Sequence, residues 1–581
     1  MKKRNLLLAA AFCAATVSTS FAQNNLGQDC GCPAVSARPS VLVSTLTTGG
    51  AGARELTAAN THLTCNTIWV LDDKIYVPNG KTITIDPGTV VKGAPNPAGD
   101  PTNAVALVVE RGGKVIADGT QSCPIVFTAQ EDPMDGTYSL TNVGKWGGVV
   151  ILGTATNNLV LPANDVTLGA GHLCVGHSGV GYIEGFNASN GLNLFGAGDA
   201  SFPTFNDNDN SGILRYVSIR HAGAILQIGN ELNGLSLGSV GNGTTIEHVE
   251  ILAAADDNIE FFGGTVNIKN CAGIFGDDDM FDYDLGYSGK VQFYLGVAAD
   301  SLNTGDAKST DNGFECDADD NKAATAVSNH SHPIIYNCTL IGNGHINPKA
   351  DNTGPAAIQA KELTGGEFYN NVFVGFRSGL HVANARSTGT DLGDAFDQWT
   401  LTPNPAMTKA QPHTLIVKNN TFVGCGTKGN FTGNTKQYPI TTGIMKTTVG
   451  GVSVYAAFTP VTAADTAQFY TTDGNVAVVS LPGLDGKIAF NGTNSTMLDP
   501  FHAIPNANLS STITAPNDGF FTPVSYRGAF DVNKKVNLLT DWAIMQLQTI
   551  QNSNPTDLNG DGVTDSADLT IFLSRYGTSS K

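Results

Sequence analysis

The sequence predicts an all-β protein whose body is a right-handed parallel β-helix, followed by a small C-terminal α-helical segment with a calcium-binding loop. Three observations predict the solenoid: 67 glycines among 581 residues, short β-branched runs closed by glycine turns, and an internal repeat. The sequence has no sustained 3.6-residue apolar period, and this argues against a helical or α/β body. The expected divisions are a signal peptide at 1–22, a polar leader at 23–64, the β-helix at 65–540 and the tail at 541–581.

The first residues have the composition of a secretory signal. A basic head at Lys2–Arg4 is followed by the apolar run Leu6–Val17, and small residues precede an expected cleavage after Ala22. The apolar run is too short for a transmembrane anchor, and no later segment approaches about 20 uninterrupted apolar residues. We therefore expect a secreted protein, located outside the cell or on the outer cell surface.

The chain without its signal is strongly acidic. It keeps 29 of the 32 basic residues against 51 acidic ones, so its net charge is about −22. Such a charge repels phosphate polymers and excludes nucleic acid as a partner. Solubility outside the cell explains the acidity, and so does an affinity for divalent cations.

Nine cysteines remain after removal of the signal, so at least one is unpaired or bonded to another chain. Cys30 and Cys32 lie close together in the polar leader. A disulfide is favoured there over zinc, because no His or Cys cluster with zinc spacing follows. Cys271, Cys338 and Cys425 lie in strand-like runs and are expected to be small core residues. The spacing leaves the disulfide pairing open.

The internal repeat is the strongest indication of stacked coils. Its copies read LRYVSIRHAG from Leu214, IEHVEILAAA from Ile246, IKNCAGIFGD from Ile268, IYNCTLIGNG from Ile335, FYNNVFVGFR from Phe368 and VKNNTFVGCG from Val417. The steps of 32, 22, 67, 33 and 49 residues indicate a coil near the shortest step, with insertions or extra coils elsewhere. Stacked coils would pair strands about 4.8 Å apart and bury a column of aliphatic and phenylalanine side chains.

Asparagine recurs at the third position of four copies, at Asn270, Asn337, Asn370 and Asn419. A turn residue or an amide ladder is the expected role, and a ligand-binding row is the alternative. A β-sandwich would lack a motif repeated at coil spacing, and a β-propeller would need more regular periods.

Several stretches resemble a family of secreted Gly/Asp-rich proteins of Bacteroidetes-type bacteria, which share the pectin-lyase-like β-helix architecture. The resemblance covers about residues 65–535. It is carried by KTITIDPGTVVKG, LVVERGGKVIADGT, CPIVFTA, KWGGVVILG, DDNIEFFGGTVNIKN, GDDDMFDYDLGYSGKVQF and SYRGAFD. Membership would imply the β-helix fold and an extracellular or outer-surface location, but no agreed activity.

The tail contains DLNGDGVTDSAD at residues 557–568, which has the ligand spacing of an EF-hand loop. Gly562 allows the sharp turn at the sixth position, and oxygen ligands alternate around it. The expected calcium ligands are Asp557, Asn559, Asp561, Val563 through its carbonyl, Asp565 and Asp568. The loop resembles one repeat of a type I dockerin, because it ends in Asp where an EF-hand has Glu. Dockerins normally have two repeats and only one is found here, so cohesin binding does not follow. A metal-free surface turn is the alternative.

Acidic residues cluster before and within two expected strands. Asp256 and Asp257 precede one strand, and Asp277 and Asp278 follow about one coil later, so stacking would make their carboxylates neighbours. Paired carboxylates can hydrolyse a glycosidic bond, hold calcium against an acidic sugar or stabilise a loop. A calcium-dependent lyase would also need a basic residue nearby. The nominal bases are Arg215, Arg220 and Lys290.

These features predict a secreted or cell-surface calcium-binding β-helix protein with a structural, adhesion or glycan-binding role. The alternative is a polysaccharide lyase or glycoside hydrolase acting on acidic polysaccharide, with Asp256, Asp257, Asp277 and Asp278 as catalytic residues. An extracellular polysaccharide or a surface protein is the expected partner, and the sequence leaves the oligomeric state open. Motifs of phosphate loops, Ser/His/Asp nucleophiles and zincins are absent from the sequence.

Overall fold

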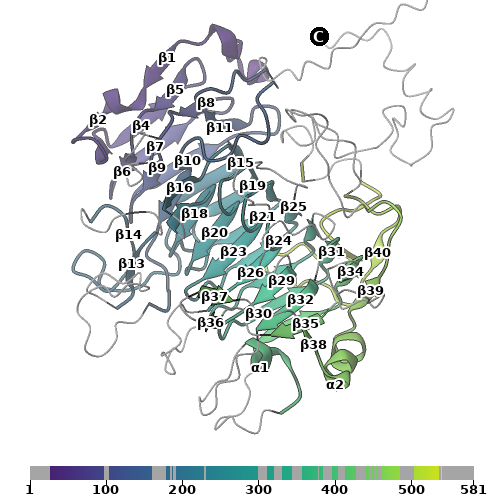
Figure 1. The fold of residues 1–581 in the computed structure, drawn as a ribbon. Coiled ribbons are helices and arrows are strands. Elements are labelled where there is room, and N and C mark those ends of the chain that lie inside the picture. Colours follow the sequence, from purple (N-terminus) through teal and green to yellow (C-terminus); the bar gives the residue numbers. More distant parts are fainter. Residues whose placement is uncertain are drawn as a thin grey trace, which may run out of the picture.

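The computed structural model shows a long stack of β-coils that runs from the N-terminal strands to those near residue 480 (Figure 1). The residues that it describes are 26–96, 104–135, 137–159, 178–183, 186, 191–227, 230–298, 310–318, 330–342, 356–376, 378–383, 395–403, 413–426, 440–443, 447–449, 452–454, 459–484, 503–534 and 538–539. The expected signal peptide and the expected calcium loop lie outside these residues.

Two large sheets form the walls of the stack, and their strands pair mostly in parallel between successive coils. The 20-stranded sheet contains β1 (Ser40–Leu42), β4 (Asn60–Leu63), β5 (Ile68–Leu71), β7 (Thr82–Ile85), β8 (Val90–Gly93), β10 (Lys114–Asp118), β11 (Ile125–Ala129), β15 (Gly212–Arg220), β19 (Thr245–Leu252), β21 (Asn267–Lys269), β22 (Ala272–Ile274), β24 (Lys290–Gln292), β25 (Leu295–Val297), β27 (Ile334–Tyr336), β28 (Thr339–Ile341), β30 (Gly366–Tyr369), β31 (Val372–Val374), β33 (Leu415–Lys418), β34 (Thr421–Val423) and β39 (Val476–Val478). The 13-stranded sheet contains β2 (Thr47–Thr48), β3 (Arg54–Leu56), β6 (Ile75–Val77), β9 (Leu107–Val109), β12 (Val149–Leu152), β18 (Leu235–Gly238), β20 (Ile259–Phe262), β23 (Phe281–Asp284), β26 (Phe314–Cys316), β29 (Ala356–Ala360), β32 (Ser378–Ala383), β35 (Ile440–Gly443) and β38 (Thr459–Pro460). The predicted parallel β-helix is confirmed, and its larger sheet begins at β1, within the segment expected as a polar leader.

Short helices and two-stranded antiparallel sheets lie outside the two large sheets. Two short α-helices lie near its C-terminal end, α1 at Ala395–Trp399 and α2 at Ala463–Ala467 (Figure 1). Antiparallel pairs join β13 (Val180–Tyr182) to β14 (Leu194–Gly196), β16 (Ala224–Gln227) to β17 (Asn230–Leu232), β36 (Thr447–Val449) to β37 (Val452–Val454) and β40 (Leu509–Ser510) to β41 (Tyr526–Arg527). Among the described residues, no helix has the length and apolar character needed to cross a membrane.

The repeat found in the sequence marks one corner of each coil. The third residue of all six copies has a positive φ between 49° and 59°, in the left-handed region that asparagine tolerates better than most residues. The six residues are Tyr216, His248, Asn270, Asn337, Asn370 and Asn419. Phe293 has the same conformation, so a further copy begins at Val291 and divides the 67-residue step. The asparagines are therefore turn residues, as expected.

An amide ladder runs beside this corner, through the residue that follows it. Asn371 Nδ2 donates to Asn420 Oδ1 at 3.0 Å, and Asn420 Nδ2 donates to Asn475 Oδ1 at 3.2 Å. The corner residues instead hold the C-terminal segment: Asn337 Nδ2 donates to the Tyr526 carbonyl at 2.7 Å, and Asn370 Nδ2 to the Ile513 carbonyl at 2.8 Å. Both structural roles expected for the asparagines are thus present, and the corner column has a ladder contact of its own, because Asn419 Nδ2 donates to Asn370 Oδ1 at 2.7 Å.

The core is the column that the repeat predicts. Phenylalanines stack from coil to coil, with ring centroids 4.8 Å apart for Phe261 and Phe281 and 5.2 Å apart for Phe281 and Phe314. Disulfides join Cys30 to Cys123 and Cys32 to Cys65, so both leader cysteines are bonded to the solenoid. The expectation of buried core cysteines is confirmed, and the described free thiols are those of Cys271, Cys316, Cys338 and Cys425.

Candidate functional site: stacked carboxylates on the smaller sheet

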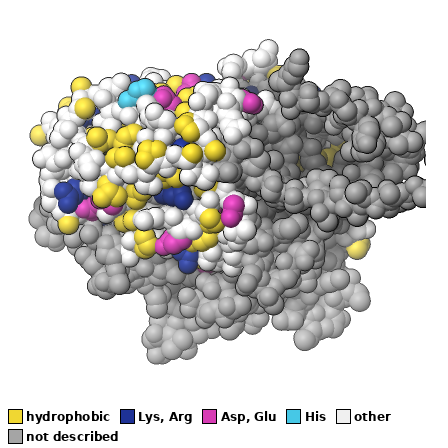
Figure 2. All heavy atoms as spheres, turned by 90° about the horizontal axis from the view of Figure 1, so that it is seen from above, with side chains coloured by type: hydrophobic (Ala, Val, Ile, Leu, Met, Phe, Trp, Pro, Cys, Tyr) yellow, Lys and Arg dark blue, Asp and Glu magenta, His cyan; other side chains and the backbone are white. Residues whose placement is uncertain are grey.

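Acidic side chains form a row on the outer face of the 13-stranded sheet. The strand register aligns Glu260 of β20 with Asp282 of β23, and Asp282 with Glu315 of β26. Their strand neighbours Phe261 and Phe281 point into the core, so these carboxylates point outward. Glu260 and Asp282 are nevertheless buried, at 7% and 9% exposure. Figure 2 shows the face seen from above, where the charged side chains of the described residues are scattered between hydrophobic ones.

The turns that lead into these strands carry a second polar column. Each member lies two residues before its strand and accepts a hydrogen bond from a backbone N–H of the next coil. Asn233 Oδ1 accepts from Asp257 N at 3.1 Å, and Asp257 Oδ1 accepts from Asp279 N at 2.8 Å. Asp279 Oδ1 then accepts from Asn312 N, and Asn312 Oδ1 from Ala356 N at 3.0 Å. We call Asn233, Asp257, Asp279 and Asn312 the turn ladder.

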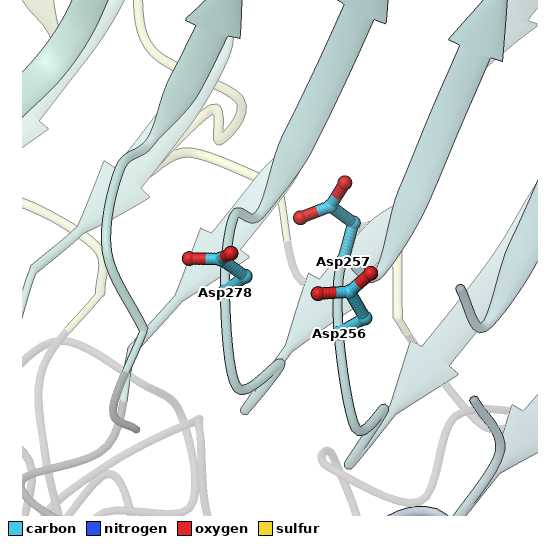
Figure 3. Close-up of side chains that lie close together, drawn as sticks. All are labelled: Asp256, Asp257 and Asp278. Carbon is cyan, nitrogen blue, oxygen red and sulfur yellow. The ribbon is translucent and has the colours of Figure 1, made fainter. Parts of the chain in front are cut away.

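The row and the turn ladder bring carboxylates into three close groups. In each group one ligand atom per residue lies within 4.8 Å of the others. The groups are Asp256, Asp257 and Asp278 (Figure 3); Asp257, Glu260 and Asp282; and Asp279, Asp282 and Glu315. Asp282 is common to the last two groups, which makes it the centre of the arrangement.

Three of the four residues in the candidate catalytic set are therefore neighbours, and Asp277 is not part of their group. The register pairs Glu260 with Asp282, a coil step of 22 residues instead of the 21 that separate Asp256 from Asp277. Asp277 consequently lies one position out of step, with its backbone N–H bonded to the Ala254 carbonyl and its side chain fully buried. In Figure 3, Asp256 and Asp278 lie on consecutive turns.

Burial and mutual repulsion perturb the acids at the centre. Burial first, and then neighbouring carboxylates, raise the pKa values of Asp257, Asp279 and Asp282 well above the usual range. For Asp282 the strongest of these neighbours are Glu315 and Asp317. Without a compensating cation, these acids therefore hold their protons to a higher pH than exposed carboxyl groups do.

A lysine terminates the acidic row. Lys361 Nζ lies 2.9 Å from Glu315 Oε1 and 2.9 Å from Asp317 Oδ2. Burial lowers the pKa of Lys361, but the carboxylates of Asp317, Glu315 and Asp282 raise it more, so the net shift is well above the usual range. Lys361 is therefore a fixed cation and not a proton acceptor at neutral pH.

The nominal bases lie elsewhere in the fold. Arg215 and Arg220 belong to β15 and Lys290 to β24, all in the 20-stranded sheet. Arg215 binds Asp118 at 2.9 Å, and Lys290 pairs with Asp518 of the C-terminal segment. The arrangement around Asp282 thus offers clustered oxygen ligands and one fixed cation, which suits cation binding better than proton abstraction.

Comparison with known families agrees with the observed coils. Residues 55–445, more than half of the chain, match the family described as "Pectate-lyase like beta helix domain". The chain belongs to this family. Neither the curated proteins nor the solved structures include a match to it. The matched range contains every residue of the turn ladder and of the acidic row, and the family supports a carbohydrate-related or structural role for this pectate-lyase-like β-helix.

The candidate catalytic set left out residues that the structure of this β-helix places at the centre of the cluster. These residues are Glu260, Asp279, Asp282 and Glu315. A signal for them is present in the sequence: NGLSL, DNIEF, DMFDY and NGFEC, starting at residues 233, 257, 279 and 312, share one pattern of Asn or Asp followed by alternating core and polar positions. The predicted ligands between residues 557 and 568 lie outside the described residues and remain a prediction.

Proposed function

We propose that this protein is an exported, calcium-binding β-helix that retains an acidic polysaccharide or a surface protein without cleaving it. The observation that carries the proposal is the stack of carboxylates around Asp282, with Lys361 fixed in its charged form beside it. At the partly exposed edge of this stack, calcium held by Asp256 and Asp278 can bridge to a negatively charged sugar. The long coil stack provides an extended surface for binding.

Export is supported by the chemistry of the cysteines and by the N-terminal sequence. The disulfides Cys30–Cys123 and Cys32–Cys65 persist in an oxidising compartment and not in a reducing cytosol. The expected signal sequence before Gln23 leads to the same compartment. The predicted loop at 557–568 would add a second calcium site, which serves either to fix the terminal helix or to attach another surface protein.

Cleavage of an acidic polysaccharide is the second candidate, favoured by the close carboxylates of Asp256, Asp257 and Asp278. A retaining glycosidase needs two carboxyl groups about 5–5.5 Å apart, and an inverting one needs about 6.5–9.5 Å to admit water. In this group one ligand atom of each of the three residues lies within 4.8 Å of the other two, a convergence that suits oxygens around one cation. Binding is therefore the better account of the site.

The test is a paired assay on the mature chain, residues 23–581, with acidic and neutral polysaccharides in calcium or in chelator. We expect retention of an acidic polysaccharide in calcium, its release by chelator, and no new reducing ends or unsaturated uronates. The matched variant Asp256→Asn/Asp278→Asn removes charge at nearly constant volume. Products that appear with the wild type and disappear with this variant would overturn the binding proposal in favour of catalysis.

A further inference from the structure

The turn ladder shows that an amide is sufficient to join successive coils. Asn233 and Asn312 each accept a backbone N–H of the next coil, at 3.1 and 3.0 Å. Asp257 and Asp279 make the same contact through Oδ1. Coil stacking thus uses one oxygen of each aspartate. The negative charge and the second oxygen at these two central rungs are not needed for it.

These two charges also lie where a negative charge is most costly. Asp257 and Asp279 are 6% and 2% exposed, and they lie beside Glu260, Asp282 and Glu315. Like charges in a poorly solvated place destabilise a fold unless a cation or a hydrogen-bond donor compensates them. Lys361 forms ion pairs at the far end of the row, with Glu315 and Asp317.

Asp282 provides an independent indication of a missing ligand. Its side chain is 91% buried, and Oδ1 has no hydrogen-bond partner among the described residues. Its ligand atoms lie within 4.8 Å of those of Asp257 and Glu260 on one side. On the other side they lie equally close to those of Asp279 and Glu315. A buried carboxylate among other carboxylates must be neutralised by a proton or by a bound cation, and the convergence of five acidic side chains favours a cation.

We propose that Asp257, Glu260, Asp279, Asp282 and Glu315 form a buried site for a hard divalent cation, with Asp282 as the central ligand. Among the described residues, the metal-ligating atoms that converge there are carboxylate oxygens, so zinc and other metals that prefer nitrogen or sulfur fit poorly. Calcium fits best because it accepts six to eight oxygens in flexible geometry, including both oxygens of one carboxylate. The cation neutralises the cluster and fastens three successive coils together.

This inference rests on the proposed calcium binding but not on polysaccharide binding, and the site is distinct from the predicted loop at 557–568. Its test uses thermal unfolding of the full mature chain in calcium and in chelator. We expect calcium to raise the melting temperature of the wild type. Asp282→Asn should abolish most of this increase, and in chelator it should melt above the wild type because one repulsive charge is gone. A role limited to packing would lower the melting temperature equally in both conditions.

The chain itself supplies the matched controls. Asp257→Asn and Asp279→Asn convert the central rungs into the amides found at Asn233 and Asn312, so they keep the coil-joining hydrogen bond and lose only the charge. They serve as second variants if Asp282→Asn folds poorly. We expect each to weaken calcium binding to the solenoid at least tenfold, measured by equilibrium dialysis with radioactive calcium.

Asp561→Asn separates this site from the terminal loop. It should leave the calcium-dependent increase in melting temperature intact and remove only the ion bound by the tail. If Asp561→Asn abolishes the increase while Asp282→Asn, Asp257→Asn and Asp279→Asn do not, the buried site is refuted and the terminal-loop proposal stands. Equal calcium affinity and equal stoichiometry in the wild type and in all three solenoid variants would also refute it.

Discussion

Replacement of Lys361 by methionine tests the electrostatic account of the acidic row. Lys361 forms two ion pairs of 2.9 Å, with Glu315 and Asp317, and its side chain is 28% exposed. Removing one partner of a fully buried ion pair costs about 3–5 kcal/mol, because the remaining charge is left uncompensated. Since Lys361 keeps some contact with solvent, we expect a loss of about 2–4 kcal/mol in the free energy of unfolding at neutral pH.

The assay is urea unfolding in chelator, followed by circular dichroism. Lys290→Met is the matched control, because Lys290, which is 33% exposed, pairs with one acid among the described residues, Asp518. This change should cost less than about 1 kcal/mol. Calcium should recover part of the loss in Lys361→Met, because a cation beside Asp282 replaces the missing positive charge. If Lys361→Met loses no more stability than Lys290→Met, the reasoning about the row is wrong.

Three further predictions concern other parts of the fold. Asn420→Ala removes a buried side chain that accepts a hydrogen bond from Asn371 N at 2.8 Å and donates one to the Phe368 carbonyl at 3.0 Å. The free energy of unfolding in urea should therefore fall by about 2–4 kcal/mol. A loss below about 1 kcal/mol would contradict the structural role of the amide ladder. Burial, with a contribution from Glu55, raises the pKa of Glu110 to about 7, so the folded state binds an extra proton between about pH 4.5 and 7 and loses stability as the pH rises through that window. Glu110→Gln should therefore exceed the wild type in stability by up to about 3 kcal/mol at pH 8 and lose this advantage by pH 5, and a pH-independent difference would count against it. Cys30→Ser/Cys123→Ser removes a disulfide that joins residues 93 positions apart, and the free energy of unfolding should fall by about 2–4 kcal/mol. Equal melting temperatures of the oxidised wild type and the variant would show that this disulfide does not stabilise the fold.

The sequence by itself determined the architecture of this protein. The six repeat copies share a core pattern and a third residue that turns each coil, and asparagine at that residue follows from its tolerance of the left-handed region. These are local requirements, so they are visible in the order of residues. The copy at Val291 was missed; like the copies that begin at Leu214 and Ile246, it has no asparagine at the turn, which Phe293 occupies.

Only the tertiary structure decided which acids meet. The step between coils is the sum of strand and turn lengths, and it is fixed by hydrogen bonds between coils; a step of 22 residues places Asp279, and not Asp277, above Asp257. The next step inserts further residues and still returns Glu315 to the register of Asp282. The number of residues between two strands does not reveal this alignment, because an inserted loop of any length can lead back to the same strand register. The sequence therefore predicted that acidic residues cluster in these coils, whereas the stacking of the coils decided that Asp282 lies at the centre.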